Sequence, residues 1–177
     1  MKELIIGCGK QKDKKLLSMN GDCSFKNPTT LDINPKVNPD VVWDLEELPL
    51  PFDDNEFDEI HAYEVLEHTG EQGDYKFFFA QFKDLWRMLK HRGHLCCSVP
   101  RWDSVWAYGD PSHKRVINKG SLIFLSQSEY KKQIDENTSP MTDFRHIYDA
   151  DFKVCKFRDE GYSFYFVLQA IKENENE

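Results

Sequence analysis

Glycine and acidic residues directly follow three of the apolar runs in the first 50 residues of the chain. Gly7, Cys8 and Gly9 come after the first run, where the missing glycine side chains would let a ligand approach the backbone closely. Asp32 ends the second run, 25 residues after Gly7, and its carboxylate can accept hydrogen bonds from both hydroxyls of a ribose. Asp44 ends the third run, where it can accept from an adenine amino group. The order of these residues predicts a nucleoside-binding site.

Two histidines are the candidates for acid–base chemistry. His68 follows the fourth apolar run, and it either acts as a general base or caps the following turn. His113 lies in a turn-forming Asp-Pro-Ser-His sequence, where a catalytic and a structural role are both open. The histidines and cysteines of residues 91–97 do not predict a metal site, because Cys96 and Cys97 are adjacent on a strand and point to opposite faces. We therefore expect no metal.

The segment of residues 101–118 is long and irregular, and it carries Trp102, Trp106 and Tyr108. Irregular loops longer than about 12 residues are uncommon in compact domains unless they are functional or disordered. Aromatic rings with polar tips suit a small planar or sugar-like acceptor. We expect these three residues to bind the substrate. The alternative is that both tryptophans fill the core beneath the C-terminal strands.

The strands that would position these residues follow from hydrophobic periodicity. Short apolar runs bounded by turn residues predict strands at 4–6, 29–33, 41–45, 57–65 and 93–100. Because these runs are nearly continuous, both faces of the strands should be covered, as in a parallel sheet. Ligands bind beyond the carboxyl ends of such strands, where the glycines and acids lie.

Helices and a hairpin complete the predicted architecture. Apolar residues spaced three and four apart predict a helix from Tyr75 to Leu89, capped by Asp74 and ending near residues 91–93. A second helix is expected over residues 119–135. Two runs around a glycine turn, at 152–157 and 163–171, predict an antiparallel hairpin. The expected fold is α/β: a Rossmann-like, doubly wound sheet, mostly parallel, with a C-terminal antiparallel hairpin.

We expect a single domain over residues 1–177. Residues 1–100 would be its cofactor-binding half, and residues 101–177 would supply the substrate loop, a helix and the hairpin. The first crossover, residues 10–28, is short and polar, so its helix should be abbreviated.

The charge and cysteine content limit the partners. The chain carries 23 Lys and Arg against 31 Asp and Glu, a net charge of −8, which does not favour binding to nucleic acid through its phosphates. No apolar run approaches the roughly 20 residues that a membrane-spanning helix needs. Five cysteines without framework spacing indicate reduced thiols and a cytoplasmic location. A small-molecule partner is expected.

The motifs together resemble the class I S-adenosylmethionine-dependent methyltransferases, of the small, type-11-like kind. The resemblance is carried by residues 4–9, 31–35 and 40–45, and most specifically by the Leu-Pro-Leu-Pro-Phe stretch from Leu48 that runs into Glu64-Val65-Leu66-Glu67-His68. It covers residues 1–100 and is architectural beyond them. It implies an enzyme that moves a methyl group from S-adenosylmethionine to an acceptor by direct in-line transfer, without a metal or a covalent intermediate.

The resemblance also implies where the cofactor lies. The glycine loop would pass under its methionine part, and the acid after the second strand would hold the ribose. The next side chain and the third strand end would contact the adenine, and the fourth strand end would line the floor near the sulfonium. The implied cofactor-binding residues are Gly7, Cys8, Gly9, Asp32, Ile33, Asp44, Leu45, Tyr63 and Glu64.

The chain departs from the family pattern in the glycine motif. Ile5 stands where the family often has an acid, and Gln11 stands where a third glycine is usual. A nicotinamide-binding Rossmann protein is therefore one alternative, because the basic run Lys10–Lys15 could attract a phosphate. A module that binds S-adenosylmethionine without catalysis is the other.

Overall fold

A computed structural model describes residues 1–10, 13–15 and 24–172. It contains one seven-stranded sheet with the strand order β3-β2-β1-β4-β5-β7-β6. The strands are β1 (Glu3–Ile6), β2 (Thr29–Asp32), β3 (Val41–Val42), β4 (Phe57–Tyr63), β5 (Leu89–Pro100), β6 (Asp151–Glu160) and β7 (Ser163–Ile171).

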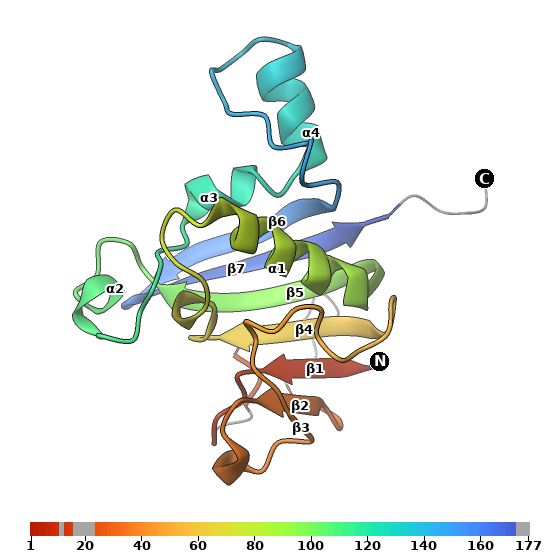
Figure 1. Cartoon of the computed structure of the whole chain (residues 1–177), viewed down its shortest axis with the longest axis vertical. Helices are drawn as coiled ribbons and strands as arrows, with labels where there is room; N and C mark the ends of the chain where they lie inside the picture. Colours follow the sequence, from red (N-terminus) through yellow and green to blue (C-terminus); the bar gives the residue numbers. More distant parts are fainter. Residues whose placement is uncertain (11–12, 16–23, 173–177) are drawn as a thin grey trace.

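The first five strands are parallel, and the C-terminal hairpin is antiparallel to them. β1 lies between β2 and β4, with Leu4 opposite Ile60. β7 pairs with both β5 and β6 in antiparallel register, with Cys97 opposite Phe166. Figure 1 shows the carboxyl ends of the parallel strands meeting at one edge of the sheet. The predicted fold class and the predicted hairpin are confirmed.

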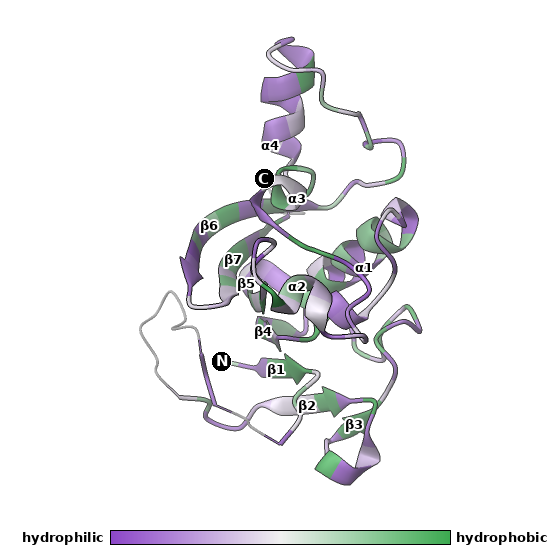
Figure 2. Ribbon diagram, turned by 90° about the vertical axis from the view of Figure 1, so that its left-hand side faces the viewer, coloured by the Kyte–Doolittle hydropathy of each residue, from purple (hydrophilic) through white to green (hydrophobic). Residues whose placement is uncertain are grey.

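Helix α1 (Tyr75–Met88) crosses one face of the sheet between β4 and β5. Asp74 caps its start, because the Asp74 side chain accepts a hydrogen bond from the Phe77 N–H at 3.0 Å. The apolar face of α1 is buried against the strands, and Figure 2 shows α1 to one side of the sheet. The expected crossover helix is therefore present with its predicted cap.

The predicted end of this helix at residues 91–93 is wrong. The helix ends at Met88, and Leu89 already begins β5 by pairing with Phe57. Arg92 and Gly93 lie where the register between β4 and β5 shifts, and Arg92 has a positive φ of 62°. A cation followed by glycine marks an irregularity in a strand here, since tertiary pairing overrides the local helix-end signal.

The predicted helix over residues 119–135 is also broken. It is replaced by α3 (Lys119–Ile123), α4 (Gln127–Tyr130) and a π-helical turn (Lys131–Asp135). Leu125 lies in the break, fully buried, and its carbonyl accepts the Phe152 N–H at 2.9 Å. Pairing with the start of β6 thus interrupts the helix. None of the helices in the described ranges combines the length and apolar composition of a membrane span.

The two faces of the sheet differ in chemistry. The face under α1 is apolar, but the opposite face carries the buried polar residues Glu3, Glu59 and His61. The Lys14 ammonium lies 2.6 Å from Glu3 Oε1 and 2.7 Å from Glu59 Oε2, and its side chain is fully buried. Burial alone would raise the pKa of Glu59, but hydrogen bonds from His61 and Lys14 outweigh it and lower that pKa. Both faces of the parallel strands are therefore buried, as expected, but only the face under α1 is apolar.

Candidate active site

A cleft of about 330 Å³ lies beyond the carboxyl ends of β1 to β4. Five of the predicted cofactor-binding residues line it: Gly7, Asp32, Ile33, Asp44 and Leu45. The sequence separates these residues by up to 38 positions, and the parallel sheet brings them together at one edge. The volume lies within the range of small-ligand sites, which is about 300–1,000 Å³.

The loop after β1 is fixed by its glycines and by Asp32. Gly7 has a φ of +60°, and a Cβ there would lie 2.3 Å from Val65 Cγ2, so only glycine fits. The Gly9 N–H donates to Asp32 Oδ2 at 2.8 Å, and the Asn34 N–H donates to Asp32 Oδ1 at 2.8 Å. A carboxylate has about four acceptor sites, so Asp32 keeps the capacity to accept from ligand hydroxyls.

Apolar and polar groups at the ends of β2 and β3 suit a purine base. The Ile33 side chain is 61% exposed at the cleft although it is apolar, whereas Leu45 is buried. Asp44 Oδ1 accepts the Glu46 N–H at 2.9 Å, which fixes the orientation of the carboxylate. An adenine lying between the two aliphatic side chains would cover the exposed surface of Ile33. The residues present therefore fit an adenosine-containing cofactor.

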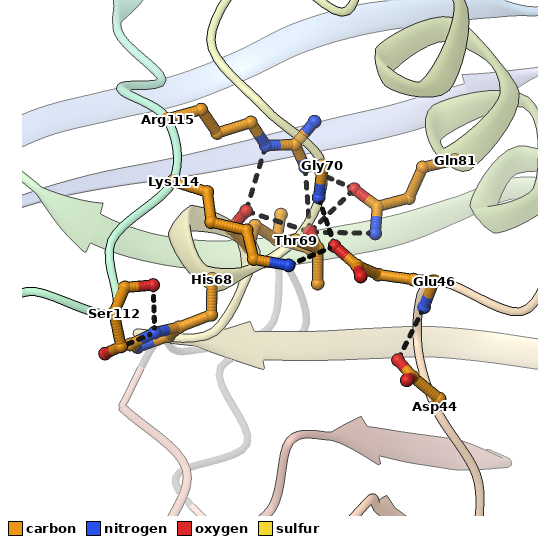
Figure 3. Close-up of polar contacts among 10 residues, drawn as sticks. Asp44, Glu46, His68, Thr69, Gly70, Gln81, Ser112, Lys114 and Arg115 are labelled. Atoms are coloured by element: carbon orange, nitrogen blue, oxygen red, sulfur yellow. Dashed lines mark hydrogen bonds and ion pairs between the residues drawn. The ribbon is translucent and has the colours of Figure 1, made fainter.

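A segment from beyond β5 closes the edge of the cleft (Figure 3). Lys114 Nζ donates to Glu46 Oε1 at 2.8 Å, and the Gly70 N–H donates to the same oxygen at 2.7 Å. The Lys114 hydrogen bond, opposed by partial burial, lowers the pKa of Glu46. Glu46 thus joins the loop after β3 to the loop after β4 and to Lys114.

Arg115 anchors the same segment beneath the surface. Its Nε donates to the Leu66 carbonyl at 3.0 Å, and its Nη2 donates to Thr69 Oγ1 at 3.1 Å and to Gln81 Oε1. Burial lowers the pKa of the Arg115 guanidinium to about 10. These bonds hold the loop after β4 against α1 (Figure 3).

The two predicted catalytic histidines lie together next to the cleft. The His68 and His113 rings contact edge to face, with centroids 4.7 Å apart, and His68 also lines the cleft. Glu67 Oε1 lies 4.0 Å from His68 Nε2. Burial raises the pKa of Glu67 to about 8. The site therefore combines two imidazoles with a buried carboxyl group.

Other predicted residues lie outside the lining of the cleft. Cys8 is buried beneath the glycine loop, and Tyr63 turns to the opposite face, where its hydroxyl lies 2.7 Å from His61 Nδ1. Glu64 has a positive φ of 52° just after β4. Gly9 does not line the cleft either, but it adjoins the cleft through its hydrogen bond to Asp32.

The predicted substrate-binding aromatics lie on the surface. Trp102 and Trp106 are 59% and 53% exposed, and Tyr108 is 74% exposed. They do not fill the core, so that alternative is wrong. Trp106 and Tyr108 belong to α2 (Trp106–Gly109), a short helix within the segment expected to be irregular. Figure 1 shows α2 beyond the carboxyl ends of the parallel strands, which is the edge that carries the cleft.

Sequence reasoning missed several residues that build the site. Glu46, Val65, Thr69 and Lys114 line the cleft, and Arg115 supports it. Val65 belongs to the most specific motif, so the sequence contained a signal that places it at the end of β4. Lys114 and Arg115 lie at least 42 residues from the loops that they contact, and no local pattern signals such a contact.

A family model described as a methyltransferase domain matches residues 4–97. Three similar solved structures are methyltransferases. A SAM-dependent methyltransferase from Archaeoglobus fulgidus is 16% identical, with a TM-score of 0.56 over 95% of this chain and 85% of that one. One from Methanosarcina mazei is 17% identical, with a TM-score of 0.57 over 97% and 93%. The N-methyltransferase NodS from Bradyrhizobium japonicum WM9, in complex with S-adenosyl-L-homocysteine, is 14% identical, with a TM-score of 0.56 over 97% and 78%.

No curated protein matches the chain. At these identities the similar structures show the fold alone. The family model spans more than half of the chain, from β1 into β5, and it includes the glycine loop and the Glu-Val-Leu-Glu-His motif. The chain therefore belongs to the methyltransferase domain family and is a class I, type-11-like enzyme that uses S-adenosylmethionine.

Proposed function

We propose that this enzyme binds S-adenosylmethionine in the cleft at the ends of β1 to β4 and transfers its methyl group directly to a small-molecule acceptor. The observation that carries the proposal is the convergence of Gly7, Asp32, Ile33, Asp44 and Leu45 on one cleft. Their chemistry matches a nucleoside: close backbone approach, a hydroxyl acceptor, two apolar surfaces and a second acceptor.

Each group has a defined task in this proposal. The Asp32 carboxylate accepts the ribose hydroxyls, while Gly9 and Asn34 hold it in place. Ile33 and Leu45 pack on the adenine faces, and Asp44 accepts its amino group. The loop from Gly7 through Cys8 to Gly9 passes beneath the methionine part, and the backbone of Tyr63 and Glu64 forms the floor. These contacts would place the methyl group toward His68.

The transfer needs orientation more than it needs acid–base chemistry. When bound, S-adenosylmethionine supplies an activated methyl group, which an acceptor lone pair takes in line while the C–S electron pair stays on sulfur. His68 and His113 are the groups beside the cleft that can hold or accept a proton if the acceptor must lose one. The chain forms no covalent bond to the methyl group.

The acceptor is proposed to lie beside His68, His113 and α2. Exposed Trp106 and Tyr108 belong to α2, and exposed Trp102 follows the carboxyl end of β5 by two residues, so their flat rings are available near this edge of the sheet. The acidic net charge of −8 favours a small molecule over nucleic acid.

Two measurements test the proposal. S-adenosylhomocysteine should raise the melting temperature of the protein, and S-adenosylmethionine should be converted to S-adenosylhomocysteine in the presence of an acceptor. The acceptor screen covers small molecules, nucleotides and peptides. Stabilisation without turnover on any acceptor would indicate a binding module without catalysis. The absence of both stabilisation and turnover would refute the proposed site.

A further inference from the structure

Glu67, His68 and His113 form a compact cluster beside the cofactor cleft. One ligating atom from each of the three residues lies within 4.8 Å of the others. Glu67 Oε1 and His68 Nε2 are 4.0 Å apart, and the two imidazole rings contact edge to face. The cluster joins residues adjacent in sequence at the end of β4 to a residue 45 positions away, beyond β5.

The Glu67 carboxylate has no hydrogen-bond partner on either oxygen, although the residue is 2% exposed. Buried carboxylates are normally paired with a cation or with hydrogen-bond donors, because an unpaired one costs several kcal/mol of solvation. The fold holds this side chain in place through its backbone: the Glu67 carbonyl accepts the Lys114 N–H at 2.8 Å. Glu67 therefore needs a partner that the described part of the chain does not supply.

In the neutral imidazoles, the hydrogen bonds of both histidines leave Nε2 with a free lone pair. His113 Nδ1 lies 2.8 Å from the Trp106 carbonyl, which can only accept, so Nδ1 carries the hydrogen. His68 Nδ1 lies 3.1 Å from Ser112 Oγ and 3.3 Å from the Ser112 carbonyl. The Ser112 hydroxyl donates to Asp110 Oδ1 at 2.6 Å, so His68 Nδ1 must also be the donor. Metal-binding histidines are oriented in this way by bonds to their second nitrogen.

The surrounding charges allow a cation. Asp110 Oδ2 lies 3.8 Å from His113 Nε2 and adds a second carboxylate. Arg115 is the opposing positive charge, but its guanidinium is bonded to Leu66, Thr69 and Gln81, and only its Nη1 lacks a partner. A water molecule bridging Glu67 and Arg115 is the rival occupant.

We infer that Glu67, His68 and His113 bind one divalent transition-metal ion. Two imidazoles and a carboxylate suit Zn²⁺, Fe²⁺ or Mn²⁺ and leave coordination positions open. Binding at about 2.0–2.2 Å would draw the three side chains together. Because His68 also lines the cofactor cleft, the open positions would face the acceptor, a role that rests on the proposed function. The metal would lower the pKa of a coordinated acceptor hydroxyl, and the histidines would then be ligands instead of bases.

A second cluster of possible metal ligands differs from the first, because a lysine side chain already occupies it. Glu3, Glu59 and His61 also lie within 4.8 Å of one another, but the Lys14 ammonium already bridges the two carboxylates. That cluster is satisfied by the chain itself. No local sequence pattern signals the first cluster, because Glu67 and His113 are 46 positions apart.

Cobalt is the probe for this site. The full-length protein is stripped with a chelator, transferred to chelator-free buffer and titrated with Co²⁺. We expect visible d–d bands that saturate at one equivalent, without a thiolate charge-transfer band, and Zn²⁺ should abolish them. Glu67→Gln, His68→Gln and His113→Gln should each weaken binding at least about tenfold. His146→Gln is the matched control, because His146 is exposed and lies outside the cluster.

Two results would overturn the inference: no saturable Co²⁺ spectrum in the wild type, or unchanged binding in all three ligand variants. Circular dichroism first establishes that each variant is folded, and only then is its Co²⁺ binding compared with that of the wild type. S-adenosylhomocysteine binding is measured on the same samples. If S-adenosylhomocysteine binds and Co²⁺ does not, the metal site is wrong and the proposed function stands. If Co²⁺ binds and S-adenosylhomocysteine does not, the cofactor cleft is wrong.

Discussion

The Gly9 backbone N–H donates to Asp32 Oδ2 at 2.8 Å and so joins the loop after β1 to the end of β2. Asn34 holds the other oxygen of the same carboxylate, also at 2.8 Å. Asp32 is thus oriented before any ligand arrives. Because the site is already ordered, little binding free energy is lost in ordering its own groups when a ligand binds.

A substitution of Ile33 should affect ligand binding but not the stability of the fold. The side chain is 61% exposed, so Ile33→Ala should change the free energy of unfolding by less than about 0.5 kcal/mol. The same change should weaken S-adenosylhomocysteine binding by about 1–2 kcal/mol, because the adenine ring loses its contact with an apolar side chain. Urea denaturation and calorimetry measure the two effects. Val42→Ala, at a 53% exposed position outside the cleft lining, should alter neither. Equal losses of affinity in both variants would count against the adenine position.

Glu67 should make the metal-free protein less stable as the pH rises. Its pKa is about 8 in the folded protein and near 4.5 in the unfolded chain. Below pH 4.5 both states are protonated, and above it only the unfolded state ionises. The free energy of unfolding should therefore fall by up to about 1.4 kcal/mol per pH unit until pH 8.

Glu67→Gln removes this dependence and should be more stable than the wild type by a few kcal/mol at pH 8. The two proteins should be nearly equal near pH 4.5. Urea denaturation in the presence of a chelator measures both across this range. A constant difference between them at every pH would show that the Glu67 carboxyl is not held neutral by the fold.

Lys14 should be essential for stability. Lys14→Met removes the cation that bridges the buried carboxylates of Glu3 and Glu59 and should cost about 3–5 kcal/mol, measured by urea denaturation. Adding Glu3→Gln and Glu59→Gln to this variant should restore part of the loss, because no buried charge remains. Lys2→Met breaks an exposed pair with Glu56 and should cost at most about 1 kcal/mol. Equal costs for the two lysines would contradict the buried network.

Trp106 should determine acceptor preference. Trp106→Ala removes a half-exposed ring but keeps the carbonyl that orients His113, so the fold should be retained. We expect the ratio of turnover rates among acceptors to change by about tenfold, the effect of losing one apolar contact. Tyr162→Ala, at the exposed turn of the hairpin, is the control. An unchanged ratio for Trp106→Ala would place the acceptor elsewhere.

The five predicted residues that line the cleft were predictable because each of them ends or directly follows an apolar run. Asp32 and Asp44 needed only the rule that parallel strands present their carboxyl ends at one edge. The metal cluster was not predictable in this way. His113 meets Glu67 only after the segment beyond β5 folds back, through Lys114 and Arg115, onto the loop after β4.

Local sequence patterns gave the wrong helix boundaries at two places where residues pair with a strand instead. Arg92-Gly93 has the composition of a helix end, yet pairing of Leu89 with Phe57 places both residues within β5. Leu125 continues a helical spacing, yet its carbonyl pairs with Phe152 and breaks the helix. In both places a long-range backbone bond decides the structure, and periodicity within a short window does not contain it.

Asp32 is the most direct test of the central claim that the cleft binds S-adenosylmethionine. Calorimetry compares S-adenosylhomocysteine binding by the wild type, Asp32→Ala, Asp32→Asn and the exposed control Asp53→Ala. The account predicts that both Asp32 variants lose about 1.5–3 kcal/mol of binding free energy, because the ribose hydroxyls lose a charged acceptor. Asp53→Ala should bind like the wild type. Equal affinity in the wild type and both Asp32 variants would contradict the account.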